Sequence, residues 1–365
     1  MRYCSRTLFV LIISTLSLAA AFVLGSPSSK NMPLVSKAIV ASKPMASRQI
    51  LPNEGPQPLL DLSALTRSAD LIVLGEVASI REDGRIALAQ GGKTIEGQSM
   101  VAELIALSVL KGKLDGATIS FAFPVPVTGS GYRSIAQNQF GLFFLRTDGD
   151  KHTTIVNPYY PFLVAAPGSP RLEGDDLDRV VSAIADLLTL PRVELRREAV
   201  YILDTAPTDK ATEALRRATS DDDTVVKWQA LAALLRRGDI SVLDTAEEVL
   251  SHPTPKVEKY LRRNVAVSVE GIRDPRAIAT LGRLLAAPDI ETRRSSAGAL
   301  RHMHSTAAIP ALLTALENSD SGVRYQGVIG LAELTREDEV PSVELFQKNE
   351  QRYVSRWKQW GSSRK

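Results

Sequence analysis

The fold is decided by residues 289–316, which read DIETRRSSAGALRHMHSTAAIPALLTAL. Apolar residues recur at helical spacing in both halves of this stretch, first at Ala297, Leu300 and Met303 and then across 309–316, with polar residues between the halves. The stretch therefore predicts two consecutive α-helices, each with an apolar face too wide for the pair to cover alone.

The same pattern recurs along residues 191–345 and marks an internal repeat. A basic residue returns at steps of 31, 35, 31 and 31 residues, with an apolar residue seven positions after it and, in four of five units, an acidic residue four positions before it. The basic positions are Arg196, Lys227, Arg262, Arg293 and Arg324, the apolar ones are Leu203, Leu234, Val269, Leu300 and Leu331, and the acidic ones are Asp223, Glu258, Asp289 and Asp320. In the second helix of each unit the matching apolar positions are Leu215, Ala246, Leu281, Leu312 and Val343. Because stacked helix pairs bury a continuous core, the sequence predicts an α-helical solenoid of five units.

These residues resemble the HEAT repeat family, in particular the short HEAT-like repeats of phycobilin lyases. The resemblance rests on the acid-x-x-x-Arg spacing that opens the first helices, the alanine-rich run after it, and the Ile-Pro-x-Leu opening of the second helix at Ile309. It implies a concave binding face lined by the second helices. The candidate partner contacts on that face are Glu213, Arg216, Arg217, Arg276, Thr280, Arg283, Thr314 and Glu317.

The recurring acids and bases, called the ladder below, have a structural interpretation. An acid at a helix start interacts favourably with the helix dipole and can pair with the base four residues later, which stabilises an exposed helix by a few tenths of a kcal/mol. We therefore interpret the ladder as structural rather than as a binding site.

The N-terminus predicts export. Residues 1–25 combine a short basic opening with an uncharged apolar run from Thr7 to Gly25, which is typical of a signal peptide. The run also approaches the length of a membrane span, so an uncut anchor over 7–25 is the alternative. Residues 26–57 are basic and rich in proline and serine, which predicts a disordered linker.

Residues 58–165 change to a β-type pattern. Short β-rich runs, such as 71–77 and 140–145, are separated by turn signals that include Asp83-Gly84. They predict a small antiparallel β-barrel or sandwich ahead of the solenoid. The order of the runs resembles netrin-like and tissue-inhibitor-of-metalloproteinase-like OB barrels.

Two further helices are predicted at the borders of the repeats. Residues 166–190 contain an apolar stripe that predicts a connecting helix between the domains, and residues 346–365 carry Tyr353, Trp357 and Trp360 at helical spacing. Since terminal repeats must cover the end of the stack, we interpret 346–365 as a capping helix with a basic tail; a membrane-surface or partner-helix role is the alternative.

The charge distribution and the motifs of the sequence favour an interaction protein over an enzyme. The chain has a net charge of +3, but acids outnumber bases in the predicted folded parts, which disfavours nucleic-acid binding. It shows no motif of a zinc protease, nucleophile elbow or phosphate loop, and we expect no cofactor and no metal site. The leading hypothesis is an exported, non-enzymatic scaffold that binds a partner protein. A lyase-like or cofactor-handling protein and an envelope-anchored structural protein are the alternatives.

Overall fold

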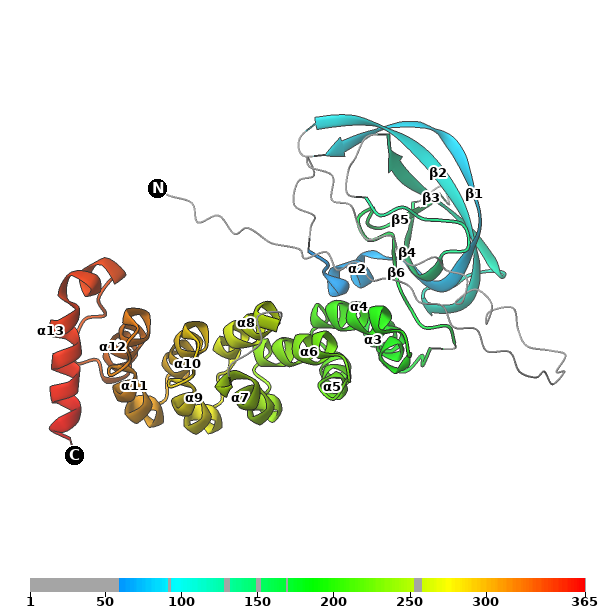
Figure 1. The fold of residues 1–365 in the computed structure, drawn as a ribbon. Helices are drawn as coiled ribbons and strands as arrows, with labels where there is room; N and C mark the ends of the chain where they lie inside the picture. Colours follow the sequence, from blue (N-terminus) through cyan, green and yellow to red (C-terminus); the bar gives the residue numbers. More distant parts are fainter. Residues whose placement is uncertain are drawn as a thin grey trace, which may run out of the picture.

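The computed structural model describes residues 59–364 except 91–92, 128–131, 149–151, 169 and 253–257. A β-barrel is followed by a row of helix pairs that extends away from it (Figure 1). The predicted combination of a small β domain and an α-helical solenoid is therefore confirmed. The predicted signal peptide and linker lie outside the described residues.

The solenoid consists of first and second helices in alternation. The first helices are α4 (Val193–Asp204), α6 (Thr224–Arg236), α8 (Lys259–Ser268), α10 (Ile290–His302) and α12 (Ser321–Thr335). The second helices are α5 (Asp209–Ala218), α7 (Leu243–Ser251), α9 (Ile278–Leu284), α11 (Ile309–Ala315) and α13 (Val343–Ser362). Figure 1 shows the first helices in one row and α5, α7, α9 and α11 in a second row below it. Short 3₁₀ segments precede α7, α9 and α11 at Ile240–Val242, Pro275–Ala277 and Thr306–Ala308.

The core of the solenoid is built from the repeated apolar positions. The residue seven positions after each ladder base is buried in every unit, with a relative exposure of 0% at Leu203, Leu234, Val269, Leu300 and Leu331. Full burial of one such side chain contributes about 1.5–3 kcal/mol, so this column alone is a large part of the driving force for stacking.

At the matching apolar position of the second helices, the residue is buried in four units and exposed in the fifth. Leu215, Ala246, Leu281 and Leu312 are 0% exposed, whereas Val343 is 51% exposed. The expectation for Val343 is wrong because α13 begins only at this residue, with Ser342 as its N-cap. The inward position falls one turn later, at Phe346, which is buried and packs on Tyr325 with ring centroids 5.1 Å apart.

Helix α13 is both the second helix of the fifth unit and the cap of the stack. The expected border between residues 345 and 346 therefore lies inside one helix, which is kinked at Asn349. Trp357 is buried, and Tyr353 and Trp360 pack against the core. Three basic residues of the tail form ion pairs: Arg356 with Asp338 (2.9 Å) and Arg364 with Glu337 (2.5 Å) in the loop between α12 and α13, and Lys358 with Glu317 of the fourth unit (2.7 Å). This arrangement is that of a cap.

The β domain is a closed barrel. Its strands are β1 (Leu71–Gln90), β2 (Lys93–Lys111), β3 (Thr118–Pro126), β4 (Phe140–Thr147), β5 (Thr153–Ile155) and β6 (Phe162–Leu163). Neighbouring strands follow the order β1-β2-β3-β5-β4, and β1 also pairs with β4, which closes the ring. A five-stranded barrel of this kind is the architecture of OB-type domains.

Two details of the barrel differ from the sequence-based expectation. Asp83-Gly84 is not a turn between strands, because β1 runs through it; the pairing with β2 shifts register there, and Gly84 takes a φ of +143° that favours glycine. The sheet is also not antiparallel throughout, since β3 and β5 pair in parallel at Ala122 and Thr154.

One apolar cluster joins the outer face of the barrel to the solenoid, and a second cluster fills the barrel interior. The barrel interior holds Val77, Leu104 and Phe143, while residues on the other face of the same strands, such as Ile72 and Phe144, pack with the helices below. Those helices are α2 (Leu62–Ser68) and α3 (Asp176–Ala185), and their buried side chains belong to the same cluster as those of α4 to α13. No separate interface therefore divides the two domains.

Candidate functional site

The ladder arginines bind backbone carbonyl groups that precede their own helices. The Nη1 atom of Arg196 donates to the Leu190 carbonyl at 3.1 Å, that of Arg293 to the Ala287 carbonyl at 2.9 Å, and that of Arg324 to the Asn318 carbonyl at 2.6 Å. Arg262 reaches the Leu250 carbonyl at the end of α7 at 2.6 Å. These bonds satisfy carbonyls where the chain turns from one unit into the next.

The ladder acids cap the first helices. Asp223, Asp289 and Asp320 accept hydrogen bonds from the backbone N–H three residues later, at 3.0, 2.9 and 3.0 Å. Glu258 stands at the N-cap of α8 without a side-chain cap bond. Such caps stabilise a helix by about 1 kcal/mol each.

The expected pairing of each acid with the base four residues later is wrong. No ion pair of this kind joins the ladder residues that the structure describes; instead, three acids bind arginines of the preceding unit. These pairs are Arg197 with Asp223 (2.5 Å), Arg262 with Asp289 (2.6 Å) and Arg294 with Asp320 (2.8 Å). The ladder therefore connects neighbouring units.

The same contacts shift the pKa values of the ladder acids. Hydrogen bonds from Arg197 and Arg294 lower the pKa of Asp223 and Asp320, respectively. Burial raises the pKa of Asp289, but hydrogen bonds from Thr292 and Arg262 outweigh it, so the net shift is downward. All three carboxylates are thus held in their charged form at the unit boundaries.

The predicted partner-binding residues lie on or beside the second helices. Glu213, Arg216 and Arg217 belong to α5, Arg276 to the 3₁₀ segment before α9, Thr280 and Arg283 to α9, Thr314 to α11, and Glu317 follows α11. All are exposed except Thr280, which is 8% exposed. We call the surface of α5, α7, α9 and α11 the second-helix face.

Several of these side chains tie neighbouring units together. Arg216 binds Asp239 at 2.7 Å, and Arg283 binds Glu247 at 2.6 Å. The acidic partners Asp239 and Glu247 were missed from sequence; the signal for Asp239 was its place as N-cap of the 3₁₀ segment before α7. Arg276 pairs with Asp274 of its own unit, at 2.6 Å.

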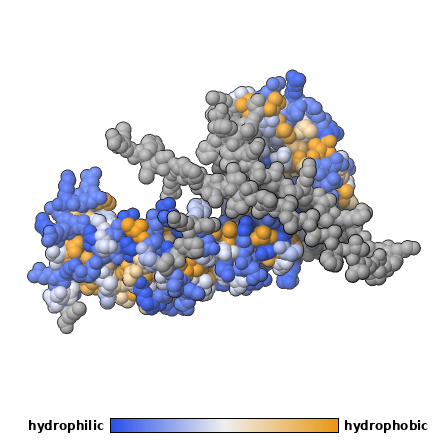
Figure 2. All heavy atoms as spheres, in the orientation of Figure 1, coloured by the Kyte–Doolittle hydropathy of each residue, from blue (hydrophilic) through white to orange (hydrophobic). Residues whose placement is uncertain are grey.

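The surface of the solenoid does not present one large apolar patch on the side seen in Figure 2. Hydrophilic residues dominate there, and hydrophobic residues lie in small separate groups. The exposed large apolar side chains include Tyr201 on α4, Tyr260 and Val267 on α8, and Val343 and Leu345 on α13. Recognition through the solenoid would therefore depend on polar as well as apolar contacts.

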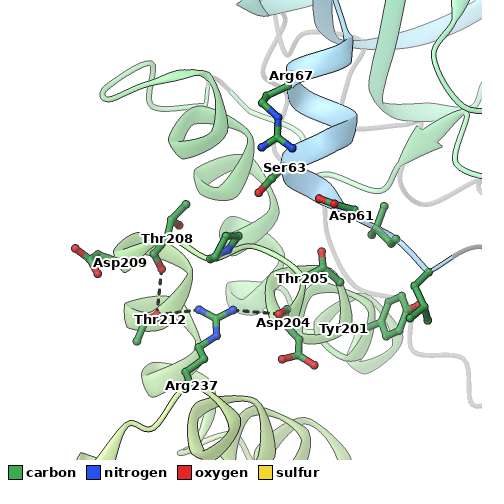
Figure 3. A pocket seen from close by; sticks show the side chains of 13 residues that line it. Asp61, Ser63, Arg67, Tyr201, Asp204, Thr205, Thr208, Asp209, Thr212 and Arg237 are labelled. Carbon is green, nitrogen blue, oxygen red and sulfur yellow. Dashed lines mark hydrogen bonds between the residues drawn. The ribbon is translucent and has the colours of Figure 1, made fainter.

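A cavity of about 980 Å³ lies between α2 and the first two units; we call it the junction cavity (Figure 3). One wall is formed by α2 and the residues just before it, with Ser63 and Arg67. The other walls are the end of α4 with Tyr201, the start of α5 with Thr208, and Arg237 after α6. Sequence reasoning did not identify this site, because it joins segments far apart in the chain.

Arg237 is the most unusual residue of the junction cavity. It stands ten positions after the ladder base, where the other units carry an apolar residue: Ala206, Ile272, Met303 and Leu334. Its guanidinium donates to the Leu203 and Ala206 carbonyls at 2.7 and 2.9 Å and to the Thr212 hydroxyl at 2.8 Å. Burial lowers the pKa of Arg237; the nearby Asp204 carboxylate opposes this shift and the Arg236 guanidinium adds to it.

The described residues contain neither a candidate metal site nor a helix suited to span a membrane. No group of three or more His, Cys, Asp or Glu side chains in that part of the chain is placed to hold a metal ion. None of the helices found there combines the length and the apolar character needed to cross a bilayer.

Comparison with known proteins identifies the repeats. A family model described as HEAT repeats matches residues 257–332 and 281–357, so this part of the solenoid consists of HEAT repeats, as the sequence predicted. No curated protein matches the chain.

Solved structures also resemble the chain. One is the complex of CpcE and CpcF of phycocyanin lyase from Nostoc sp. PCC7120, with 23% identity over 47% of this chain and 68% of that chain and a TM-score of 0.34. The others are two engineered proteins. One has 20% identity over 44% of this chain and 82% of that chain, with a TM-score of 0.33. The second has 20% identity over 51% of this chain and 59% of that chain, with a TM-score of 0.32. The lyase-like alternative stays a prediction.

Proposed function

We propose that the protein is a non-enzymatic scaffold that binds a partner protein along the second-helix face. The observation that carries this proposal is the regular stack of helix pairs, which presents α5, α7, α9 and α11 as one row (Figure 1). Repeat proteins of this architecture use such extended surfaces for binding.

The ion pairs between units favour this face as a preformed binding surface. Arg216 and Arg283 are each held by an acid of the adjacent unit, and Glu317 is held by Lys358 of α13 at 2.7 Å. Side chains that are already ordered lose less conformational entropy on binding. The face would therefore present a fixed pattern of charges to a partner.

The test uses Arg217 and Arg276 of this face, for which no ion pair with another unit is found among the described residues. In a variant with Arg217→Glu and Arg276→Glu, reversal of both charges is expected to weaken capture of a defined partner protein at least about tenfold, or 1.4 kcal/mol. Affinity purification with the wild-type chain as bait identifies the partner, and titration of that purified partner measures the dissociation constant.

The matched control carries the same charge change elsewhere, with Lys259→Glu on α8 and Arg352→Glu on α13. Both residues are exposed and lie outside the four helices α5, α7, α9 and α11 that define the second-helix face. We expect the control to bind like wild type. Equal affinity of all three proteins for the identified partner would contradict the second-helix face as the binding surface.

We propose further that the chain is exported after cleavage of residues 1–25, on the basis of the charge and hydropathy pattern of that segment. Intact-mass spectrometry of the protein from its native source is expected to show a chain that starts after Ala21 or Gly25. A mass that retains residues 7–25 would instead favour the membrane-anchored alternative.

A further inference from the structure

We propose that the boundary between the third and fourth units is pH-sensitive, because its polar contact joins Glu270 to His302, where the first boundary carries an arginine. Neutral His302 packs beside Glu270 near neutral pH, and protonation of its ring in mild acid weakens this boundary. The inference goes beyond the proposed scaffold function and uses none of the residues of the second-helix face.

The same two repeat positions meet where neighbouring first helices end. One lies eight residues after the ladder base of a unit, and the other lies nine residues after the base of the next unit. Asp204 and Arg236 form an ion pair in this way at 2.5 Å, and Arg301 and Glu333 form one at 2.6 Å with the charges exchanged. Since arginine and carboxylate side chains are charged throughout the range around neutral pH, these two boundaries hold permanent ion pairs.

The other two boundaries differ. At the second boundary the backbones meet, since a Cβ on Gly271 would lie 2.4 Å from the Leu235 carbonyl oxygen. At the third boundary, Nδ1 of His302 lies 3.7 Å from Oε1 of Glu270. Gly298, one turn before His302 on α10, makes room for this carboxylate, because a Cβ there would lie 3.0 Å from the same oxygen. Of these four contacts among the described residues, the third alone contains a side chain that titrates near neutral pH.

The position of the His302 ring disfavours a positive charge. Nδ1 is buried and finds no hydrogen-bond partner among the described residues, although 32% of the side chain is exposed. A proton on this nitrogen would create a buried donor without an acceptor at hydrogen-bond distance, which costs free energy. A neutral ring avoids that cost.

The charged and titratable groups around the ring come from three parts of the solenoid. They are Arg301 and His304 beside it in the chain, Glu270 and Arg273 after α8, and Glu333 on α12. Burial lowers the pKa of His302, and the two arginines lower it further, whereas the two glutamates oppose the shift. His304 is exposed and acts on Glu333, whose pKa it helps to lower.

The sign of the pH effect follows from these contacts. The unfolded chain takes up a proton on His302 at the ordinary pKa of histidine, whereas the pKa is lower in the folded chain. As the pH falls from the ordinary value through the lowered one, the unfolded chain binds the proton first, so the stability contributed by neutral His302 is lost. Glu270 limits this loss, because its carboxylate attracts the charged ring.

The first experiment titrates the four histidines of the purified full chain by NMR of their ring protons, with His302→Gln to assign the His302 signal. We expect His302 to take up its proton at a lower pH than a histidine in an unfolded peptide. Glu270→Gln is expected to lower the proton affinity of His302 at least about twofold, because it removes the attracting carboxylate. The matched control is Glu194→Gln in the first unit, which removes an exposed carboxylate and is expected to leave that affinity unchanged.

The second experiment measures unfolding in urea by circular dichroism at about pH 7.5 and about pH 5.5. Across this range the unfolding constant of the wild type is expected to rise at least about twofold more than that of His302→Gln, whose side chain does not titrate. His302→Arg places a permanent charge opposite Glu270, as at the first boundary, so we expect the smaller pH dependence there as well.

Three results would overturn the proposal. The first is a His302 that takes up its proton at or above the pH typical of an unfolded peptide. The second is an equal proton affinity of His302 in Glu270→Gln and Glu194→Gln. The third is the same pH dependence of unfolding in the wild type and His302→Gln. Because the Glu270 side chain is 50% exposed, the NMR comparison is informative even if His302→Arg does not fold.

Discussion

The Arg262→Ala variant is expected to lose about 3 kcal/mol of solenoid stability, the lower part of the range for breaking a buried ion pair. Arg262 is 7% exposed and holds two units together through Asp289 at 2.6 Å and the Leu250 carbonyl at 2.6 Å. Its removal leaves the half-buried Asp289 carboxylate without its cation. Urea denaturation followed by circular dichroism measures the loss.

The neighbouring residue provides the control for this prediction. Arg263 lies on α8 like Arg262 but is exposed, and its ion pair with Glu291 of α10 is longer, at 3.3 Å. Such surface pairs contribute about 0–1 kcal/mol, so Arg263→Ala is expected to stay close to wild type. If Arg262→Ala and Arg263→Ala lowered the free energy of unfolding equally, the burial of Arg262 would not explain the loss.

The Trp357→Ala variant is expected to destabilise the C-terminal end of the stack by about 3–5 kcal/mol. Trp357 is 1% exposed and lies on α13, which packs on α11 and α12. Because each repeat contacts mainly its neighbours, the loss should be greatest in the last two units. Hydrogen exchange is expected to accelerate most in α12 and α13 and least in α4.

Gln359→Ala serves as the control. Gln359 is exposed on the same helix, so its replacement by alanine removes no buried apolar surface. Its exchange rates should match those of wild type. Faster exchange spread evenly over all five units of Trp357→Ala would show that α13 is not a local cap but part of a single cooperative unit.

The sequence predicted the repeats well because their signal is local and periodic. Leu203, Leu234 and Leu300 repeat at a fixed distance from a base, and a periodic apolar position is buried whenever the units stack. The failure at Val343 shows the limit of this reasoning. The start of a helix decides which residue turns inward, and the Ser342 cap places Phe346 there instead.

Contacts between units were predicted less well. Asp320 was expected to pair with Arg324 in its own helix, but it binds Arg294 of the unit before. Sequence spacing shows which residues are neighbours within one helix, whereas the pair of Asp320 and Arg294 depends on how two units stack against each other. For the same reason the spacing could not show that Arg216 meets Asp239.

The strands were predicted at their cores but not at their ends. The run 71–77 is the first part of β1, which continues past Asp83-Gly84 to Gln90. A glycine with positive φ suits a turn and a bulge equally, and only the partner strand decides between them.

The candidate site was predicted in part. The eight residues proposed for partner binding lie on or beside the second helices, and their role in binding stays a prediction. The junction cavity was not predicted, yet one signal was present in the sequence: Arg237 interrupts a column in which Ala206, Ile272 and Met303 are apolar. A charged residue in a repeated apolar position is a reason to look for a site.

The apolar cluster that runs from β1 through α2 and α3 into the helix pairs has a mechanical consequence. A displacement at either end of the described chain is passed on from one unit to the next, because apolar side chains are packed between successive units. The barrel and α13 would therefore be coupled through the packing of all five helix pairs, and a shift at one end would be shared among them.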